Sequence, residues 1–198
     1  METNYDDELK KLYEQLQDAI KNSDGVEDAD LENLINISYD DLEEEILKQQ
    51  NTQKIKFKKL HDDVISPKYA YELDSGFDLY STEKIVLPAF GRALVPTGLS
   101  LDLPEGYEIQ VRTKSGLAVN LGLMVLNSPG TVDRGYLGEI KVPVFNTNNS
   151  SLIIEKGMKV AQAVLCPVVC GKFVEFEELD DLGTSERGDK GFGSTGIK

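Results

Sequence analysis

The chain has 198 residues, of which 40% are hydrophobic and 28% are charged, so it can bury a core and is not a wholly disordered protein. No apolar run approaches the roughly 18 residues of a membrane span, and the first residues, METNYDDELKK, are too acidic and polar for a secretory signal. With a net charge of −14 the protein is also not expected to bind a nucleic acid polymer. We therefore expect a cytoplasmic protein without membrane association.

The negative charge is concentrated in residues 1–50, which hold 16 acidic and 4 basic residues, whereas the remainder holds 19 acidic and 17 basic residues. Apolar residues recur at spacings of three and four between residues 9 and 20, which predicts an amphipathic helix. Shorter helical patterns follow around Leu34 and after SYDD at Ser38, which resembles a capping box. We predict that residues 1–50 form an acidic helical extension, which either packs on the protein itself or binds another protein.

Residues 51–178 change to a period of two, which is typical of strands. The apolar residues of YEIQVRT (107–113) share one face, and those of EIKVPVFN (139–146) do the same. Further short apolar runs occur in KIKFKKL, KIVLP, ALVPTGLSL, SLIIE, KVAQAVLCPV and KFVEF, separated by turn residues. Many short strands with such turns predict an all-β sandwich or barrel, in which Pro96 and Pro143 belong at edges or bulges.

Cys166 and Cys170 are the only cysteines of the sequence, in a stretch that is predicted to be a strand. Four residues apart on an extended chain, they lie about 13 Å from each other, too far for a disulfide. Together with the single histidine, His61, they make a poor zinc site. We expect two buried structural thiols and an ordinary surface histidine.

Five short segments combine glycine with polar residues: SGFDLY, RTKSGLA, GTVDRGYLGEI, GMKVAQAV and RGDKGFGSTG. Glycine and hydroxyl groups beside a cation let backbone N–H groups approach a phosphate closely, as in residues 114–116 and around Arg187. Phe192, flanked by glycines, is suited to stacking on a base. Asp133 lies between two strand patterns, where it is either a turn aspartate or a base that activates water.

In this order and spacing, the five segments resemble the five motifs of the homotrimeric all-β deoxyuridine triphosphate nucleotidohydrolases (dUTPases), over residues 55–196. The resemblance implies a distorted β-barrel or jelly roll that forms a homotrimer with shared active sites. It implies hydrolysis of dUTP to dUMP and diphosphate, which limits uracil in DNA and supplies dUMP. Residues 179–198 would then be a flexible C-terminal arm that closes a neighbouring subunit's site.

The resemblance also implies roles for individual residues. Asp133 is the general base that activates water for attack on the α-phosphorus, and Asp78 holds Mg²⁺ through water. The hairpin with Asn127 and Val132 reads uracil and excludes thymine, while Tyr136 presses on the sugar and excludes a ribose. The other implied substrate contacts are Lys114, Ser115, Gly116, Thr131, Lys141, Gln162, Arg187, Phe192, Gly193 and Ser194.

Two positions depart from the family's pattern. Lys114 stands where an arginine is usual, so a guanidinium group that can bind phosphate through two hydrogen bonds is replaced by a single ammonium group. Lys190 stands where a glycine is usual. Two alternatives stay open: a dCTP deaminase of the same fold, and a regulatory protein whose residues 1–50 bind a partner. If the source is viral, the expected location is the cytoplasm of the host.

Overall fold

The computed structural model describes Glu14 and residues 52–191. The chain divides into two compact units, residues 1–55 and residues 56–198. The helices predicted for residues 1–50, apart from the helical and exposed Glu14, lie outside the described residues, as do Phe192, Gly193 and Ser194. Within the described part of the chain, no helix is long and apolar enough to cross a membrane.

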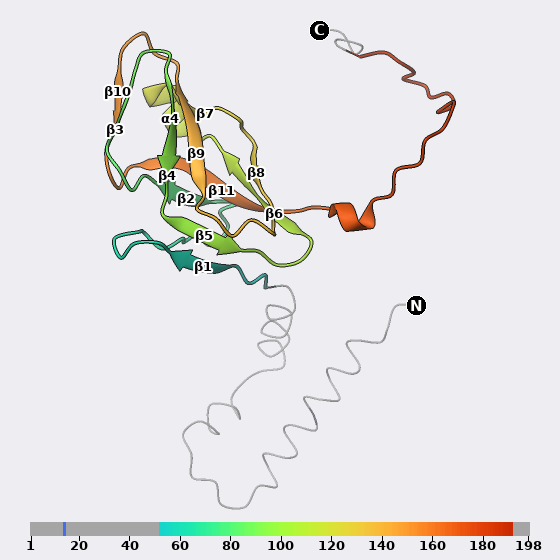
Figure 1. Cartoon of the computed structure of the whole chain (residues 1–198), viewed down its shortest axis with the longest axis horizontal. Helices are drawn as coiled ribbons and strands as arrows, with labels where there is room; N and C mark the ends of the chain where they lie inside the picture. The colour runs from blue at the N-terminus through green and yellow to red at the C-terminus, as the bar shows by residue number, and fades with distance from the viewer. Residues whose placement is uncertain (1–13, 15–51, 192–198) are drawn as a thin grey trace, which may run out of the picture. The chain divides into compact units, whose positions relative to one another are not determined.

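The second unit is built from strands, as the period of two predicts (Figure 1). The strands are β1 (Lys56–Lys59), β2 (Phe77–Tyr80), β3 (Ile85–Leu87), β4 (Arg92–Pro96), β5 (Leu99–Asp102), β6 (Tyr107–Arg112), β7 (Leu123–Val125), β8 (Gly130–Val132), β9 (Lys141–Asn146), β10 (Leu152–Ile154) and β11 (Lys159–Pro167). Residues 52–191 also form one short α-helix, α4 (Ser115–Leu121), and one 3₁₀ helix, η1 (Gly171–Phe173). The all-β prediction is confirmed.

Within residues 52–191, all the strand pairs are antiparallel, and they form four sheets. The largest sheet has the order β2-β11-β6-β8, and a second has the order β4-β9-β7. The pairs β10–β3 and β1–β5 lie at opposite ends of the body in Figure 1. Because hydrogen bonding divides the strands in this way, the barrel is distorted rather than closed by one continuous ladder.

The core lies between these sheets and follows the predicted alternation. In β9, Val142, Val144 and Asn146 are buried, whereas the two residues between them are half-buried and Lys141 is exposed. Each fully buried Leu, Ile or Val stabilises the fold by about 1.5–3 kcal/mol relative to exposure. Other hydrophobic residues with at most 1% exposure are Leu79, Leu87, Val95, Leu99, Leu101, Ile109, Leu123, Ile154, Ala161 and Ala163.

The predicted strand in KFVEF (172–176) is wrong. The chain forms η1 there and then continues without strand pairing, leaving Phe176 95% exposed. The reason is that β11 ends at Pro167, opposite Tyr107, where β6 itself begins. The residues after Pro167 therefore have no ladder to join.

The prediction of buried thiols is also wrong. Cys166 and Cys170 are free, as predicted, but both are half-exposed. Cys170 lies beyond the end of β11, and Cys166 accepts a hydrogen bond from Arg112 Nη2 at 3.4 Å. His61 is exposed in a bend, as expected.

The two prolines differ from each other. Pro96 ends β4, an edge strand, as predicted. Pro143 lies in β9, the middle strand of its sheet, so the edge prediction is wrong for it. Beyond Val144, the Leu126 N–H still donates to the Pro143 carbonyl at 2.8 Å, but proline cannot return the second bond of this pair, so the ladder between β7 and β9 ends there.

Candidate functional site

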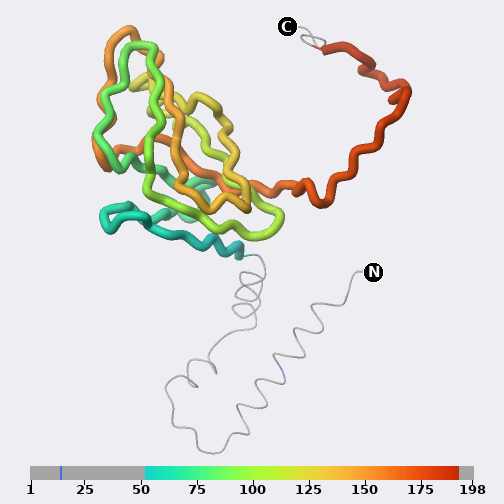
Figure 2. Tube along the Cα trace, in the orientation of Figure 1, coloured from blue at the N-terminus to red at the C-terminus, as the bar shows by residue number. Residues whose placement is uncertain are grey.

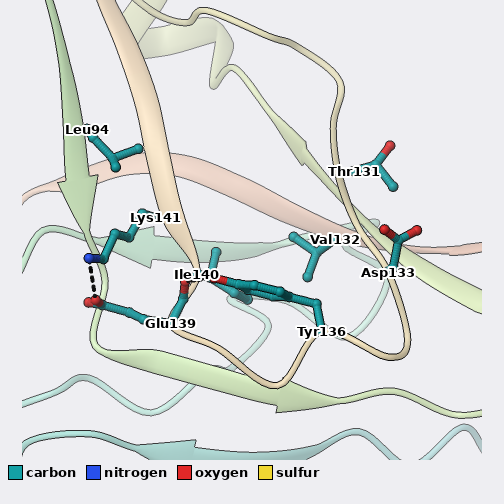
Figure 3. Close-up of a pocket in the computed structure, with 8 residues that line it drawn as sticks. All are labelled: Leu94, Thr131, Val132, Asp133, Tyr136, Glu139, Ile140 and Lys141. Atoms are coloured by element: carbon teal, nitrogen blue, oxygen red, sulfur yellow. Dashed lines mark hydrogen bonds and ion pairs between the residues drawn. The ribbon is translucent and has the colours of Figure 1, made fainter.

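A cavity of about 370 Å³ lies beside the end of β8 (Figure 3). The pairing of β8 with β6 places Val132 opposite Ile109, and Asp133 follows immediately with an exposed side chain. Asp133 and Tyr136 occupy the same loop after β8 in Figure 3, so one short segment supplies both side chains. The lining residues are Leu94, Thr131, Val132, Asp133, Tyr136, Glu139, Ile140 and Lys141.

The ring of Tyr136 is fixed within this cavity by contacts in its own loop. Its backbone N–H donates to the Asp133 carbonyl at 3.0 Å, and its hydroxyl donates to the Glu139 carbonyl at 2.9 Å. A Cβ atom at Gly138 would lie 2.7 Å from Cζ and Oη of the ring. A glycine at position 138 is therefore what allows the ring to lie where it does.

Glu139 anchors the opposite side of the cavity, and it was not predicted from the sequence. Its Oε1 accepts the Gly98 N–H at 2.9 Å, and its Oε2 pairs with Lys141 Nζ at 3.3 Å, the pair marked in Figure 3. The signal in the sequence was an acid two residues before Lys141, a spacing that puts both side chains on one face of an extended chain.

Asn127 lies before the other end of β8 and does not line the cavity; β8 pairs with β6, so the expected hairpin is not formed by neighbouring strands. Asn127 is exposed, and its side-chain amide covers Gly130, where a Cβ atom would lie 3.0 Å from Nδ2. Asn127 and Asp133 therefore flank the short strand β8, with Thr131 and Val132 between them.

A second cluster forms around Asp78 in β2, whose side chain is 11% exposed. Lys114 Nζ pairs with Oδ1, and Lys159 Nζ pairs with Oδ2 at 2.7 Å. Burial opposes ionisation, but the hydrogen bonds and charges of the two lysines outweigh it and hold the pKa of Asp78 below its ordinary value. The same contact raises the pKa of Lys159. Lys159 was not predicted as a site residue.

The segment that carries Lys114 leads into α4, a helix that was not predicted from the sequence. Lys114 is the N-cap residue with extended backbone, and Ser115 and Gly116 form the first turn, both exposed. The N–H groups of a first turn have no acceptor within their own helix. The segment thus presents an ammonium group, a hydroxyl and backbone donors together.

Gln162 of β11 joins these parts. It lies opposite Asp78 on one side and opposite Arg112 on the other, and its Nε2 donates to the Thr113 carbonyl at 3.1 Å. The structure thus brings Asp78, residues 114–116 and Gln162 together, although they come from three separate motifs.

The two clusters lie far apart on one chain. Asp78 and Val132 are on the two outer strands of the sheet β2-β11-β6-β8, three strand spacings or about 14 Å across. Along the strand direction, Asp78 is level with Arg112 of β6, because both lie opposite Gln162, whereas Val132 lies opposite Ile109. Arg112 and Ile109 are three residues apart in β6, or about 10 Å. The separation is therefore about 18 Å along the sheet, and Asp133 lies one residue further.

Arg187 belongs to neither cluster. Residues 174–191 are exposed and form neither strand nor α-helix, and the tube of Figure 2 shows them as an extended segment. Arg187 Nε donates to the Lys190 carbonyl at 3.1 Å, a local contact.

Comparison with known proteins identifies the family. The family model described as dUTPase matches residues 62–196. Deoxyuridine 5'-triphosphate nucleotidohydrolase of Hydrogenobaculum sp. is 48% identical over 146 residues, covering 73% of this chain and 99% of that protein. The enzyme of Clostridium acetobutylicum is 46% identical over 144 residues, covering 73% and 97%.

Solved structures agree with these sequences. The dUTPase of Staphylococcus bacteriophage 80alpha with dUPNHPP has a TM-score of 0.65 and 27% identity, covering 74% of this chain and 100% of that chain. The dUTPase of phage phi11 of S. aureus, whose structure describes a structural Mg(II) ion, has the same fold with a TM-score of 0.59 and 21% identity. Since the family model matches more than half of the chain, this chain belongs to the dUTPase family.

Proposed function

We propose that this protein hydrolyses dUTP to dUMP and diphosphate in the cytoplasm, which keeps uracil out of DNA. The observation that carries the proposal is 48% identity to a nucleotidohydrolase over 99% of that enzyme's length. The water oxygen forms a bond to the α-phosphorus, and the bond from that phosphorus to the oxygen bridging to the β-phosphate breaks. Diphosphate leaves with the electron pair, and Asp133 accepts the water proton.

The cavity beside β8 supports the assignment of the nucleoside end of the substrate. Asp133 and Tyr136 both line it, as does Val132, the last residue of β8. A tyrosine ring held in this position by its hydroxyl would crowd a ribose 2′-hydroxyl. We assign the uracil and deoxyribose to this cavity, with Asp133 as the base.

The cluster around Asp78 fits the triphosphate and its Mg²⁺. Within the described residues, no group of three or more His, Cys, Asp or Glu side chains could hold a metal ion, so the protein offers no cage there. Asp78 is ionised and lies beside the segment of Lys114, where its carboxylate would hold Mg²⁺ through water. Bound to the substrate, Mg²⁺ would neutralise phosphate charge. Lys114, Ser115, Gly116 and Gln162 would orient the phosphates.

A shared site in a homotrimer follows from the separation of the clusters. A base acts on a nucleophile within hydrogen-bond reach, and reacting atoms must approach to about 3–3.5 Å. Because Asp133 follows Val132, which is about 18 Å from Asp78 along the sheet of one chain, we propose that one subunit supplies the base and a neighbour supplies the phosphate cluster. The arm, with Arg187 and Phe192, would come from the third.

Subunit mixing tests the sharing. Asp133→Asn and Asp78→Asn chains, each inactive alone, should regain activity when unfolded together and refolded. With random assembly, about a quarter of the sites combine an intact Asp133 with an intact Asp78. Mixtures no more active than the separate variants would show that each chain uses its own two aspartates.

Asp133→Asn tests the reaction itself. The variant should fold, bind dUPNHPP and lose at least about 100-fold in dUTP turnover, the scale of a lost general base. Diphosphate release from dUTP and ammonia release from dCTP, both measured on the wild type, separate the hydrolase from the deaminase. Ammonia from dCTP without diphosphate from dUTP would reject the proposal.

A further inference from the structure

The ion pair between Lys159 and Asp78 has no place in the proposed reaction. Each oxygen of Asp78 has its own lysine, Lys114 on Oδ1 and Lys159 on Oδ2. The carboxylate side chain is only 11% exposed, whereas those of Lys114 and Lys159 are 28% and 49% exposed. A largely buried carboxylate thus has two separate cations, one of which lies in the segment assigned to the phosphates.

Lys159 faces Asp78 because β11 is irregular. Asp78 lies opposite Gln162, and in a regular strand Val160 would share that face while Lys159 would point inward with the buried Ala161. The register between β11 and β2 shifts between Lys159 and Ala161. One extra residue reverses the alternation, so Lys159 returns to the face of Asp78. The backbone itself is shaped to bring this ammonium to the carboxylate.

Substrate binding changes what the two lysines must do. A triphosphate competes with Asp78 for the Lys114 ammonium, because both are anions within reach of one segment. If Lys114 moves to the phosphates, Asp78 keeps a counter-ion only through Lys159. Without it, a poorly exposed carboxylate would lose its fixed orientation and the charge that favours its ionised form.

We propose that Lys159 is a positioning residue that holds Asp78 in place when Lys114 turns to the nucleotide. Lys159 does not contact the phosphates; it acts through Asp78. Lys114 is the exchangeable partner and Lys159 the permanent one. This inference rests on the proposed function, because it needs a triphosphate at the cluster.

Binding measurements on the full-length protein test the inference without turnover. Titration calorimetry with Mg²⁺ and dUPNHPP should show Lys159→Met weakened on the order of 10-fold, the usual effect of losing a group that orients a metal-site carboxylate. Binding of dUMP, which lacks the β- and γ-phosphates, should change less than about twofold. Lys159→Arg should bind dUPNHPP nearly as the wild type does.

Two further variants separate positioning of Asp78 from direct phosphate binding and from a general loss of surface charge. Lys84→Met removes the lysine of another ion pair, with Glu155 at 2.8 Å, and should change neither the affinity for dUPNHPP nor the affinity for dUMP. In the double variant Asp78→Asn/Lys159→Met, loss of Lys159 should add nothing to loss of Asp78, because the lysine acts only through that carboxylate.

The outcomes are distinguishable. If the two substitutions lower the affinity for dUPNHPP additively in the double variant, Lys159 binds phosphate directly. If Lys159→Met keeps the wild-type affinity for dUPNHPP, its ion pair with Asp78 contributes nothing to binding. Either result overturns the inference. A wild-type protein that does not bind dUPNHPP at all would instead overturn the proposed function.

Discussion

Gly138 is predicted to control the position of the Tyr136 ring. An alanine Cβ at this position would lie 2.7 Å from Cζ and Oη and 3.0 Å from Cε2 of the ring. Carbon atoms approach to about 3.5 Å, so the ring must retreat by about 0.8 Å. The ring is 49% exposed and can move, so we expect Gly138→Ala to fold with a loss of stability of at most about 1 kcal/mol.

The effect on catalysis should be much larger than the effect on stability. Displacing a positioning group by about 1 Å costs up to about 100-fold in rate, so kcat/KM for dUTP should fall about 10- to 100-fold in Gly138→Ala. The hydrogen bond from the Tyr136 hydroxyl to Glu139 should also be lost. With the ring displaced, the preference for dUTP over UTP should shrink.

Steady-state kinetics with dUTP and UTP, together with thermal unfolding, measure these effects. The matched control is Gly135→Ala in the same loop, where an added Cβ would meet no atom within 4 Å. Gly135→Ala should keep both kcat/KM and selectivity. If Gly138→Ala keeps wild-type kcat/KM and selectivity, Tyr136 does not contact the sugar in the way proposed.

Two further predictions concern stability. Asn146 is fully buried, and its Nδ2 donates to the carbonyls of Pro88 and Ser150 at 2.9 and 2.8 Å. Asn146→Ala should therefore lower the free energy of unfolding by about 3 kcal/mol in urea titrations. Asn149→Ala, at an exposed position, is the control, and equal losses in the two variants would contradict this role of Asn146. The pKa of Asp78 is held below its ordinary value of 3.8, so its ionised form stabilises the fold above the unfolded pKa, and this contribution disappears as the pH falls through the folded pKa. Asp78→Asn should therefore be less stable than the wild type at about pH 6, with the difference narrowing below about pH 4; a difference independent of pH would refute the ion pairing.

The sequence predicted the strands well where each strand has a partner. Alternation in residues 107–113 and 139–146 corresponds to β6 and β9, in which Ile109, Val111, Val142 and Val144 are buried. The same kind of pattern failed for residues 172–176, because alternation describes one segment and says nothing of a neighbour to pair with. Helix α4 was missed because its seven residues are too short for a periodic signal, although Gly122, at φ 58°, ends it in the left-handed conformation typical of a glycine after a helix.

Residues of the candidate site could be predicted where they belong to a sequence motif. They could not be predicted where the conformation of the backbone determines which side chains meet. Asp78, Lys114 and Gln162 came from a resemblance to a family, and the fold brings them together. The contact of Lys159 with Asp78 could not be predicted from the sequence. In a regular strand the side chain of Lys159 would point inward, and no residue type in β11 indicates the register shift that reverses its direction. Glu139 lies next to named positions, yet only the folded loop shows its contact with Gly98.

Each half of the proposed site is positioned by a local feature of its own segment of the chain. The irregular register of β11 aims Lys159 at Asp78, and the missing side chain of Gly138 accommodates Tyr136. Neither feature extends to the other half, because Asp78 and Val132 are about 18 Å apart along the sheet. The fold of one chain therefore does not determine the geometry between the proposed base and the phosphates. In the shared site that we propose, subunit contacts set it. Variants in one half should therefore change either selectivity for the nucleoside or affinity for the Mg²⁺-triphosphate, whereas variants at the subunit contacts should lower turnover while leaving both of those properties intact.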